Sequence, residues 1–297
     1  MRESPDPPSD LPVFPGSSRV PDHPPSGRAE VWHLDRSTTI LVTFTRTMTT
    51  EDHSFTWRER IRSGSAAVVF LLALAAATPV VLLLAIVSWG RSTNFVVERI
   101  APAIARVVLR TAGIRFHIRK HEDALRGPAV FIFNHGSTVD LLSVLALGLP
   151  RVRFVVKWEL QYNPIFLVLG RLTGQVFVQR QHSEKAVEAL HRAYSRIKRN
   201  GLSLVMAPEG TRKHPEPIGP FKKGPFRTAM DLAYPIVPIW FEGNRKLASG
   251  GALWARSGRC VAHIRPPIDT SAWTLDSLDD RIEAIRSMYL EWEGSRR

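Results

Sequence analysis

The sequence of 297 residues contains a single cysteine, Cys260. One thiol excludes an intramolecular disulfide and a zinc site built from several cysteines, and it fits a reducing compartment. Acidic residues are also scarce, because 27 Asp and Glu stand against 40 Lys and Arg, a formal net charge of +13. This excess favours an anionic partner such as a nucleic acid, a lipid surface or a phosphorylated substrate. Charge alone does not choose among the three.

Several enzyme signatures are missing. The sequence has no G-x-S-x-G turn of a serine hydrolase, and neither a P-loop nor a G-x-G-x-x-G motif follows a predicted strand. His117 and His121 have the spacing of two zinc ligands on a helix, but the residues around His117 are typical of a strand and the sequence offers no third ligand. We therefore expect no metal site.

The N-terminal part has almost no periodic apolar pattern. Its first 25 residues include eight prolines, and residues 1–57 are predicted to form a disordered, Pro-rich extension. No secretory signal is present in it. Met48 precedes a polar and then basic run, so two interpretations stay open: a genuine disordered tail, or a natural start at Met48. Under either interpretation, we expect a protein that begins at Met48 to keep its full activity.

A long apolar run follows. Ser65 to Trp89 are 25 residues without a charge, and as a helix they would extend about 37 Å, enough to cross a hydrocarbon core of ~30 Å. Pro79 allows either a kinked span or a re-entrant hairpin, and positive charge on both flanks slightly favours the hairpin. Residues 95–109 are predicted to be an amphipathic helix, lying on the membrane or packed on the domain. Residues 58–112 thus form a predicted membrane region.

Short strands alternate with helices from about residue 113 onward. This pattern predicts an α/β domain over 113–297, with a mixed, mostly parallel sheet flanked by helices and preceded by the membrane-embedded helical segment. An amphipathic helix is predicted from Ser183, which can cap its start, to about residue 200. The predicted strands are 129–133, 154–156, 176–179, 203–206, 236–241 and 260–264.

Polar residues directly follow three of these strands: His135, Arg180 and the PEGTR run at 208–212. Ligands bind outside the carboxyl ends of strands in α/β sheets, so these residues are predicted to share one site. Asp140 lies five positions after His135, about 140° around a helix axis, so the two cannot share a helical face. With His135 on the strand-to-helix turn, Asp140 in the first helical turn can bind one imidazole N–H and leave the other nitrogen free as a base. The alternative is a capping histidine beside a solvated acid.

The order of four sequence blocks resembles that of the glycerophospholipid acyltransferases. The blocks are NHGSTVD (134–140), GQVFVQR (174–180), APEGTR (207–212) and YPIVPI (234–239), and the resemblance covers about residues 114–268. A chance N-H-x-S-x-x-D in such a chain is on the order of one in a thousand. Gln179 and Ala207 depart from the residues usual in the family, which leaves the choice of substrate open.

The resemblance implies acyl transfer from acyl-CoA or acyl-carrier protein to the free hydroxyl of a lysophospholipid, 1-acylglycerol-3-phosphate above all, to make phosphatidic acid in phospholipid biosynthesis. His135 would be the catalytic base and Asp140 its orienting partner. Two arginines, Arg180 and Arg212, would bind the acceptor phosphate. The substrate-binding residues that the resemblance implies are Asn134, Ser137, Arg180, Glu209, Gly210, Thr211, Arg212 and Lys222. It implies no cofactor beyond the acyl donor, no metal and no nucleic acid. The expected partner surface is an anionic membrane, and the catalytic domain is expected on the cytoplasmic face of the cell membrane.

Two alternatives remain. One is an acyltransferase of the same family with another acceptor, such as glycerol-3-phosphate or a lyso-aminolipid. The other is a non-catalytic membrane protein that binds anionic lipid through its basic surface. A binding module has no need of His135 with Asp140, and their presence favours an enzyme.

Overall fold

The computed structural model describes residues 31–35, 38–41, 55–179 and 183–295. Strands β1 (Val31–Asp35) and β2 (Thr38–Leu41) form a two-stranded antiparallel sheet within the N-terminal extension, which the sequence pattern did not predict. The rest of that extension up to residue 54, and with it Met48, lies outside the described residues. Residues 54–297 form one compact unit, which carries the predicted membrane region and the α/β domain together.

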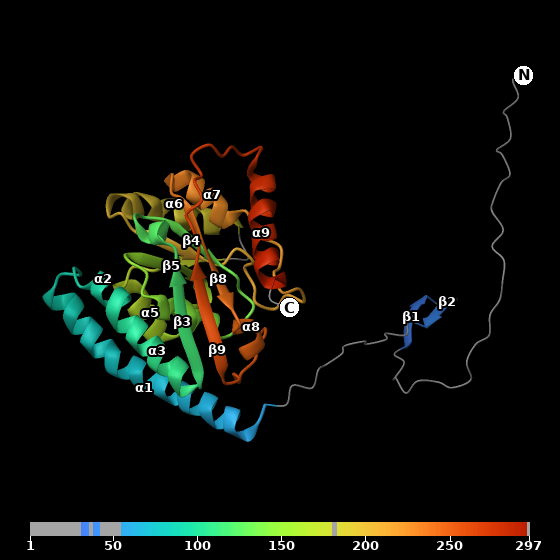
Figure 1. Cartoon of the computed structure of the whole chain (residues 1–297), viewed down its shortest axis with the longest axis horizontal. Helices are drawn as coiled ribbons and strands as arrows, with labels where there is room; N and C mark the ends of the chain where they lie inside the picture. The colour runs from blue at the N-terminus through green and yellow to red at the C-terminus, as the bar shows by residue number, and fades with distance from the viewer. Residues whose placement is uncertain (1–30, 36–37, 42–54, 180–182, 296–297) are drawn as a thin grey trace, which may run out of the picture. The chain divides into compact units, whose positions relative to one another are not determined.

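A seven-stranded sheet lies at the centre of this unit (Figure 1). Its order is β3-β9-β8-β4-β7-β5-β6, and every neighbouring pair is parallel except β8 and β9. The predicted mixed, mostly parallel sheet is therefore confirmed, and each predicted strand overlaps an observed one. The strands are β3 (Ile114–Lys120), β4 (Val130–Phe133), β5 (Val152–Lys157), β6 (Val176–Val178), β7 (Ser203–Met206), β8 (Ile236–Glu242) and β9 (Gly258–Ile264).

Helices cover both faces of the sheet, which explains why its central strands are continuous apolar runs. Along β4, Phe131 packs into one core with α1, α3 and α4, whereas Ile132 packs into a second core with α6, α7 and α9. The helices are α1 (Trp57–Val87), α2 (Thr93–Phe95), α3 (Ala101–Thr111), α4 (Asp140–Leu147), α5 (Pro164–Leu172), α6 (Ser183–Arg199), α7 (Gly224–Leu232), α8 (Asn244–Leu247) and α9 (Leu278–Gly294). Short π or 3₁₀ turns are Val96–Ile100, Glu122–Leu125 and Trp158–Tyr162.

The apolar segment is one continuous helix, α1, of 31 residues. A capping box begins it: Glu59 N donates to Thr56 Oγ1 (3.3 Å) and Thr56 N donates to Glu59 Oε2 (2.9 Å). The helix continues through Pro79, so the re-entrant hairpin that the flanking charges slightly favoured is wrong. A proline removes a single backbone N–H donor, so it can weaken a helix at one point without ending it. The helix is long and apolar enough to cross a membrane, and its outer face is exposed, which indicates membrane association.

The predicted amphipathic helix at 95–109 is also helical, through α2, a π-helical turn and α3. One face is buried on the domain, with Ala105 and Leu109 at most 1% exposed, whereas Phe95 and Val107 are 56% and 50% exposed. Arg106 Nε donates to Ala146 O at the end of α4 (2.9 Å). Packing on the domain is therefore observed, and contact of this segment with a membrane stays a prediction. The segment also contributes to holding α1 against the domain.

Candidate active site

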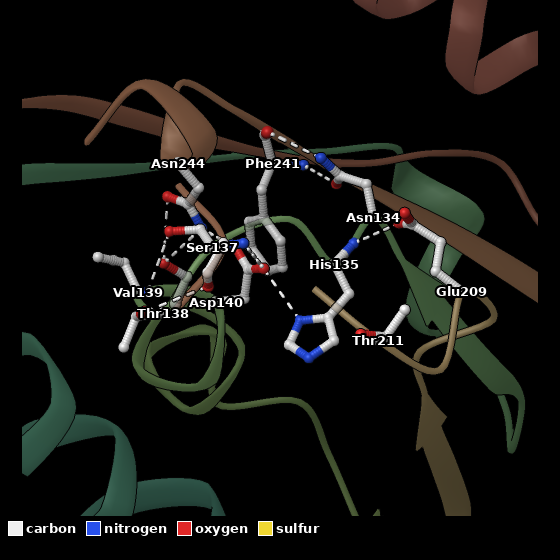
Figure 2. Close-up of polar contacts among 12 residues, drawn as sticks. Asn134, His135, Ser137, Thr138, Val139, Asp140, Glu209, Thr211, Phe241 and Asn244 are labelled. Atoms are coloured by element: carbon white, nitrogen blue, oxygen red, sulfur yellow. Dashed lines mark hydrogen bonds and ion pairs between the residues drawn. The ribbon is translucent and has the colours of Figure 1, made fainter. Parts of the chain in front are cut away.

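His135 lies in the loop between the end of β4 and the first residue of α4. Its Nδ1 is 3.0 Å from Asp140 Oδ2 (Figure 2), so the predicted placement on a strand-to-helix turn is confirmed. Phe133 packs edge-on against the imidazole at 5.5 Å between ring centroids. Because the carboxylate accepts the proton on Nδ1, Nε2 carries the free lone pair of a base.

Asp140 is held from two further directions. Ser137 N donates to Oδ2 (2.8 Å) and Asn244 Nδ2 donates to Oδ1 (2.8 Å). The carboxylate is 1% exposed, whereas the imidazole side chain is 19% exposed. A buried carboxylate with several donors is held in one orientation, and it fixes the imidazole in turn.

Sequence reasoning missed Asn244, the first residue of α8. It follows β8, which pairs parallel with β4, so their carboxyl ends lie at the same edge of the sheet. Asn244 Nδ2 also donates to Ser143 Oγ (3.0 Å), and the side chain is buried between the two partners. The signal was present: a polar residue follows the predicted strand 236–241, as at the other strand ends.

Arg245, the next residue, was missed as well. Its guanidinium donates to the main-chain oxygens of His214, Pro215 (2.8 Å) and Glu216. It also lies against Gly136, where an added Cβ would approach Arg245 Nη1 to 3.5 Å. Arg245 therefore connects the loop of His135 to the loop that follows the PEGTR run.

Glu209 ties β7 to the histidine loop. Its Oε1 accepts a hydrogen bond from His135 N (2.6 Å) and its Oε2 accepts one from Gly219 N (2.8 Å). Burial raises the pKa of the Glu209 carboxyl above its usual range, against the opposing effect of these two N–H donors. Both oxygens thus face main-chain amides of the protein, so Glu209 shapes the site by positioning the backbone of His135.

Asn134 and Ser137 shape the same loop. The Asn134 amide donates to Phe241 O (3.2 Å) and accepts from Phe241 N (2.7 Å), which fastens the loop to β8. Ser137 Oγ accepts from Val139 N (3.1 Å) just before α4. Both side chains are buried, so their observed contacts are internal, and substrate contact by either of them stays a prediction.

The third sequence block forms the loop after β7. Gly210 has φ of +68°, and a Cβ there would lie 3.0 Å from Lys222 Nζ, so this position favours glycine. Lys222 N also donates to Pro208 O (2.8 Å), which brings this lysine to the loop. Thr211 is exposed and Arg212 half-buried, and both follow β7 directly beside the end of β4.

Arg180 lies outside the described residues. Strand β6, which precedes it, is separated from β4 by β7 and β5. At ~4.8 Å per strand this amounts to about 14 Å across the sheet. The structure therefore brings His135, Asp140, the 208–212 loop and Lys222 together, and it leaves a shared site with Arg180 as a prediction.

An apolar cavity of about 190 Å³ is lined in part by α4, the helix that follows the histidine loop. It begins at Leu141, the residue after Asp140, and continues between α4, α5, α1 and α3 to β5 and β6. Its lining is almost entirely apolar; Thr173 and Gln175 are the polar side chains among the described residues that line it. A cavity of this kind suits a hydrocarbon chain.

Comparison with known proteins agrees with this geometry. Residues 114–242 match the family model described as Acyltransferase. The 1-acyl-sn-glycerol-3-phosphate acyltransferase of Limnanthes douglasii is 30% identical over 187 residues, which cover 63% of this chain and 66% of that protein. That of Haemophilus influenzae is 32% identical over 152 residues, 51% of this chain and 62% of the relative. The chain thus spans slightly less than two thirds of the length of these relatives.

A solved structure shows the same fold. The crystal structure of the 1-acyl-sn-glycerophosphate acyltransferase PlsC from Thermotoga maritima aligns with a TM-score of 0.65 at 20% sequence identity. The alignment covers 79% of this chain and 98% of that chain.

Proposed function

This chain belongs to the acyltransferase family, and we propose that it is a membrane-bound O-acyltransferase that makes phosphatidic acid. It would transfer a fatty acyl group from an acyl thioester, acyl-CoA or acyl-carrier protein, to the free hydroxyl of 1-acylglycerol-3-phosphate. The observation that carries this proposal is the His135–Asp140 pair at the start of α4, together with an apolar cavity that the leucines of the same helix line.

The proposed chemistry needs one base. His135 Nε2 takes the hydroxyl proton as the acceptor oxygen attacks the thioester carbonyl carbon. The tetrahedral intermediate then collapses, the C–S bond breaks, and the leaving thiolate takes the proton back from Nε2. Asp140 keeps the ring in one tautomer and stabilises the imidazolium between these two steps. General base catalysis of this kind contributes ~10²- to 10⁴-fold.

The acceptor phosphate needs cations near the base. Arg212 lies in the 208–212 loop, whose Glu209 is bonded to the backbone of His135, and Lys222 lies over Gly210 of the same loop. A guanidinium binds two phosphate oxygens with parallel hydrogen bonds. We therefore assign Arg212 and Lys222 to the phosphate, with Arg180 as a further contact.

The apolar cavity would hold the acyl chain. It is lined by Phe70, Leu74 and Val81 of α1 on one side and by α4 on the other, so the membrane helix itself forms part of it. A chain held there places its carbonyl end beside His135. We place the catalytic domain on the cytoplasmic face of the membrane, where acyl thioesters are made.

Product analysis by mass spectrometry tests the proposal. The purified protein in detergent is incubated with one acyl donor, either acyl-CoA or acylated acyl-carrier protein, and one acceptor at a time. The acceptors compared are 1-acylglycerol-3-phosphate, glycerol-3-phosphate and a lyso-aminolipid. We expect phosphatidic acid from 1-acylglycerol-3-phosphate as the dominant product. A faster reaction with either of the other acceptors would reassign the substrate, and the absence of any acylated product would remove the enzymatic assignment.

A further inference from the structure

A second cavity lies at the edge of the sheet opposite His135. Strands β4, β7 and β5 run parallel; His135 follows the carboxyl end of β4, whereas Arg151 and Arg153 lie at the beginning of β5. At ~3.3 Å per residue, the length of β5 separates the two edges by about 16–20 Å. This cavity therefore lies apart from the groups assigned to acyl transfer.

Arginine side chains dominate its lining. The cavity has a volume of about 420 Å³ and lies between the loop after α1, the start of β5, the end of α5 and the end of α6. Among the described residues, no acidic side chain lines it. The five arginines of this cavity are Arg91, Arg151, Arg153, Arg171 and Arg196.

Arg153 is the buried member of this group, with 6% of its surface exposed. Its guanidinium donates to Val152 O (2.8 Å) and Asn94 Oδ1 (3.0 Å), both neutral oxygens. Desolvation, together with the charges of Arg196 and Arg151, lowers the pKa of Arg153 to about 10, against a raising effect of Glu98. The protein thus holds a desolvated cation next to others of the same sign.

Arg196 approaches the same point from α6. A Cβ placed on Gly174 would lie 3.4 Å from Arg153 Nε and 3.4 Å from Arg196 Nη1, so the two guanidiniums converge on this glycine. Arg196 Nη2 donates to Gly174 O (2.9 Å) and Arg171 Nη2 donates to Gln161 Oε1 (2.6 Å). These partners are again neutral. One carboxylate lies nearby, because Arg151 N donates to Glu98 Oε1 (2.7 Å), and the guanidiniums still outnumber it, so like charges repel one another.

We propose that this cavity binds a phosphate monoester, and that in the membrane this phosphate belongs to the head group of an anionic phospholipid. Guanidinium groups match phosphate oxygens in geometry and charge, and several of them around one concave site favour a doubly charged anion. The last turn of α1 carries exposed Ile86 and Val87, and Trp89 in the cavity lining is 88% exposed. Tryptophan favours the boundary between lipid and water, which places this cavity at head-group level.

Equilibrium binding of dihexanoyl phosphatidic acid to the purified full chain in detergent tests the proposal. Every protein in the test also carries Arg212→Gln, which weakens phosphate binding at the His135 edge. The cavity variant, Arg171→Gln with Arg196→Gln, removes two exposed arginines of the cavity. The control variant, Lys198→Gln with Arg199→Gln, removes the same charge from exposed positions of α6 outside the cavity. A parallel titration uses inorganic phosphate.

We expect the cavity variant to bind dihexanoyl phosphatidic acid at least about 10-fold more weakly, and the control to change less than about 2-fold, because charged hydrogen bonds are lost only in the first. Weaker binding of inorganic phosphate than of the lipid identifies a head group as the ligand, and equal binding identifies free phosphate. Equal affinities in both variants, or equal losses, would overturn the proposal. Acyl transfer by the cavity variant with Arg212 intact should stay near normal, which separates this test from that of the proposed function.

Discussion

The two edges of the central sheet differ in how their charged side chains are hydrogen-bonded. At the carboxyl edge of β4, each buried acid has internal donors: Asp140 accepts from Ser137 N, Asn244 Nδ2 and the His135 ring, and Glu209 accepts from two main-chain amides. At the other edge, five arginines surround a cavity, and their side-chain hydrogen bonds described above go to neutral oxygens.

This difference distinguishes the proposed catalytic site from the proposed anion-binding site. The histidine edge is already organised, since the proposed base His135, its proposed orienting acid Asp140 and the second acid Glu209 have fixed partners within the chain. The arginine edge holds five guanidiniums beside the carboxylate of Glu98, so positive charge is in excess, and the crowding of like charges costs free energy that a bound anion would offset. Substitutions at the first edge should therefore change turnover, whereas substitutions at the second should change ligand binding.

The largest effect is expected from His135→Ala. Loss of the base should lower kcat by at least about 10²-fold while the protein stays folded and membrane-associated. His117→Ala, on the exposed part of edge strand β3, is the matched control and should leave kcat within about 2-fold. Steady-state kinetics and thermal unfolding in detergent measure both quantities. Near-normal turnover of His135→Ala would remove the general base from the mechanism.

A smaller loss is expected from Asp140→Asn, at least about 10-fold in kcat. The amide can donate to Nδ1 and so stabilise the tautomer whose Nε2 carries the proton and no longer acts as a base. KM should change little, because Asp140 is buried and does not face the substrate. A loss confined to KM, or a fall in the melting temperature large enough to unfold the protein at the assay temperature, would contradict this role.

Much of the histidine edge was predictable because its signals are local. The apolar run of β4, the helix that begins at Asp140 and the five-residue spacing all lie within a dozen positions. Strand β7 was predicted with its observed bounds, since a short apolar run between turn residues is a strong pattern. The order of the sheet depends on chain crossings that no local pattern encodes.

The features that were missed depend on contacts between distant parts of the chain. Asn244 reaches Asp140 across 104 positions, and Arg153 reaches Asn94 across 59. Arginines scattered over several elements look like ordinary surface residues until the fold brings them to one cavity. The hairpin expectation at Pro79 failed for another reason: the flanking charges describe preferred orientation and say nothing of whether the helix breaks.

A third effect should appear in substrate affinity. Arg212→Lys keeps the charge but loses the planar fork, so KM for 1-acylglycerol-3-phosphate should rise about 5- to 10-fold and KM for the acyl donor less than about 2-fold. Arg227→Lys, on the exposed face of α7, is the control and should change neither constant. Equal increases for both substrates would show that Arg212 does not bind the acceptor selectively.

The smallest effect concerns stability at the histidine edge and its dependence on pH. Burial raises the pKa of Glu209, so between the ordinary pKa of 4.5 and the raised value the folded protein holds a proton that the unfolded chain has released. The free energy of unfolding contributed by this carboxyl should therefore be present below pH 4.5 and be lost as the pH rises through the raised pKa. Glu209→Gln cannot titrate, and Glu184→Gln on the exposed surface of α6 is the control.

Chemical unfolding in detergent at several pH values gives the difference in unfolding free energy between the wild type and each variant. As the pH rises, the wild type should lose stability relative to Glu209→Gln. An offset that does not depend on pH reports one lost hydrogen bond, because the NH2 group of glutamine cannot accept from the main-chain N–H that it faces. For Glu184→Gln the difference should stay level. A slope of the opposite sign at Glu209 would mean that the N–H groups of His135 and Gly219 outweigh burial, and that the pKa of this carboxyl is lowered on folding.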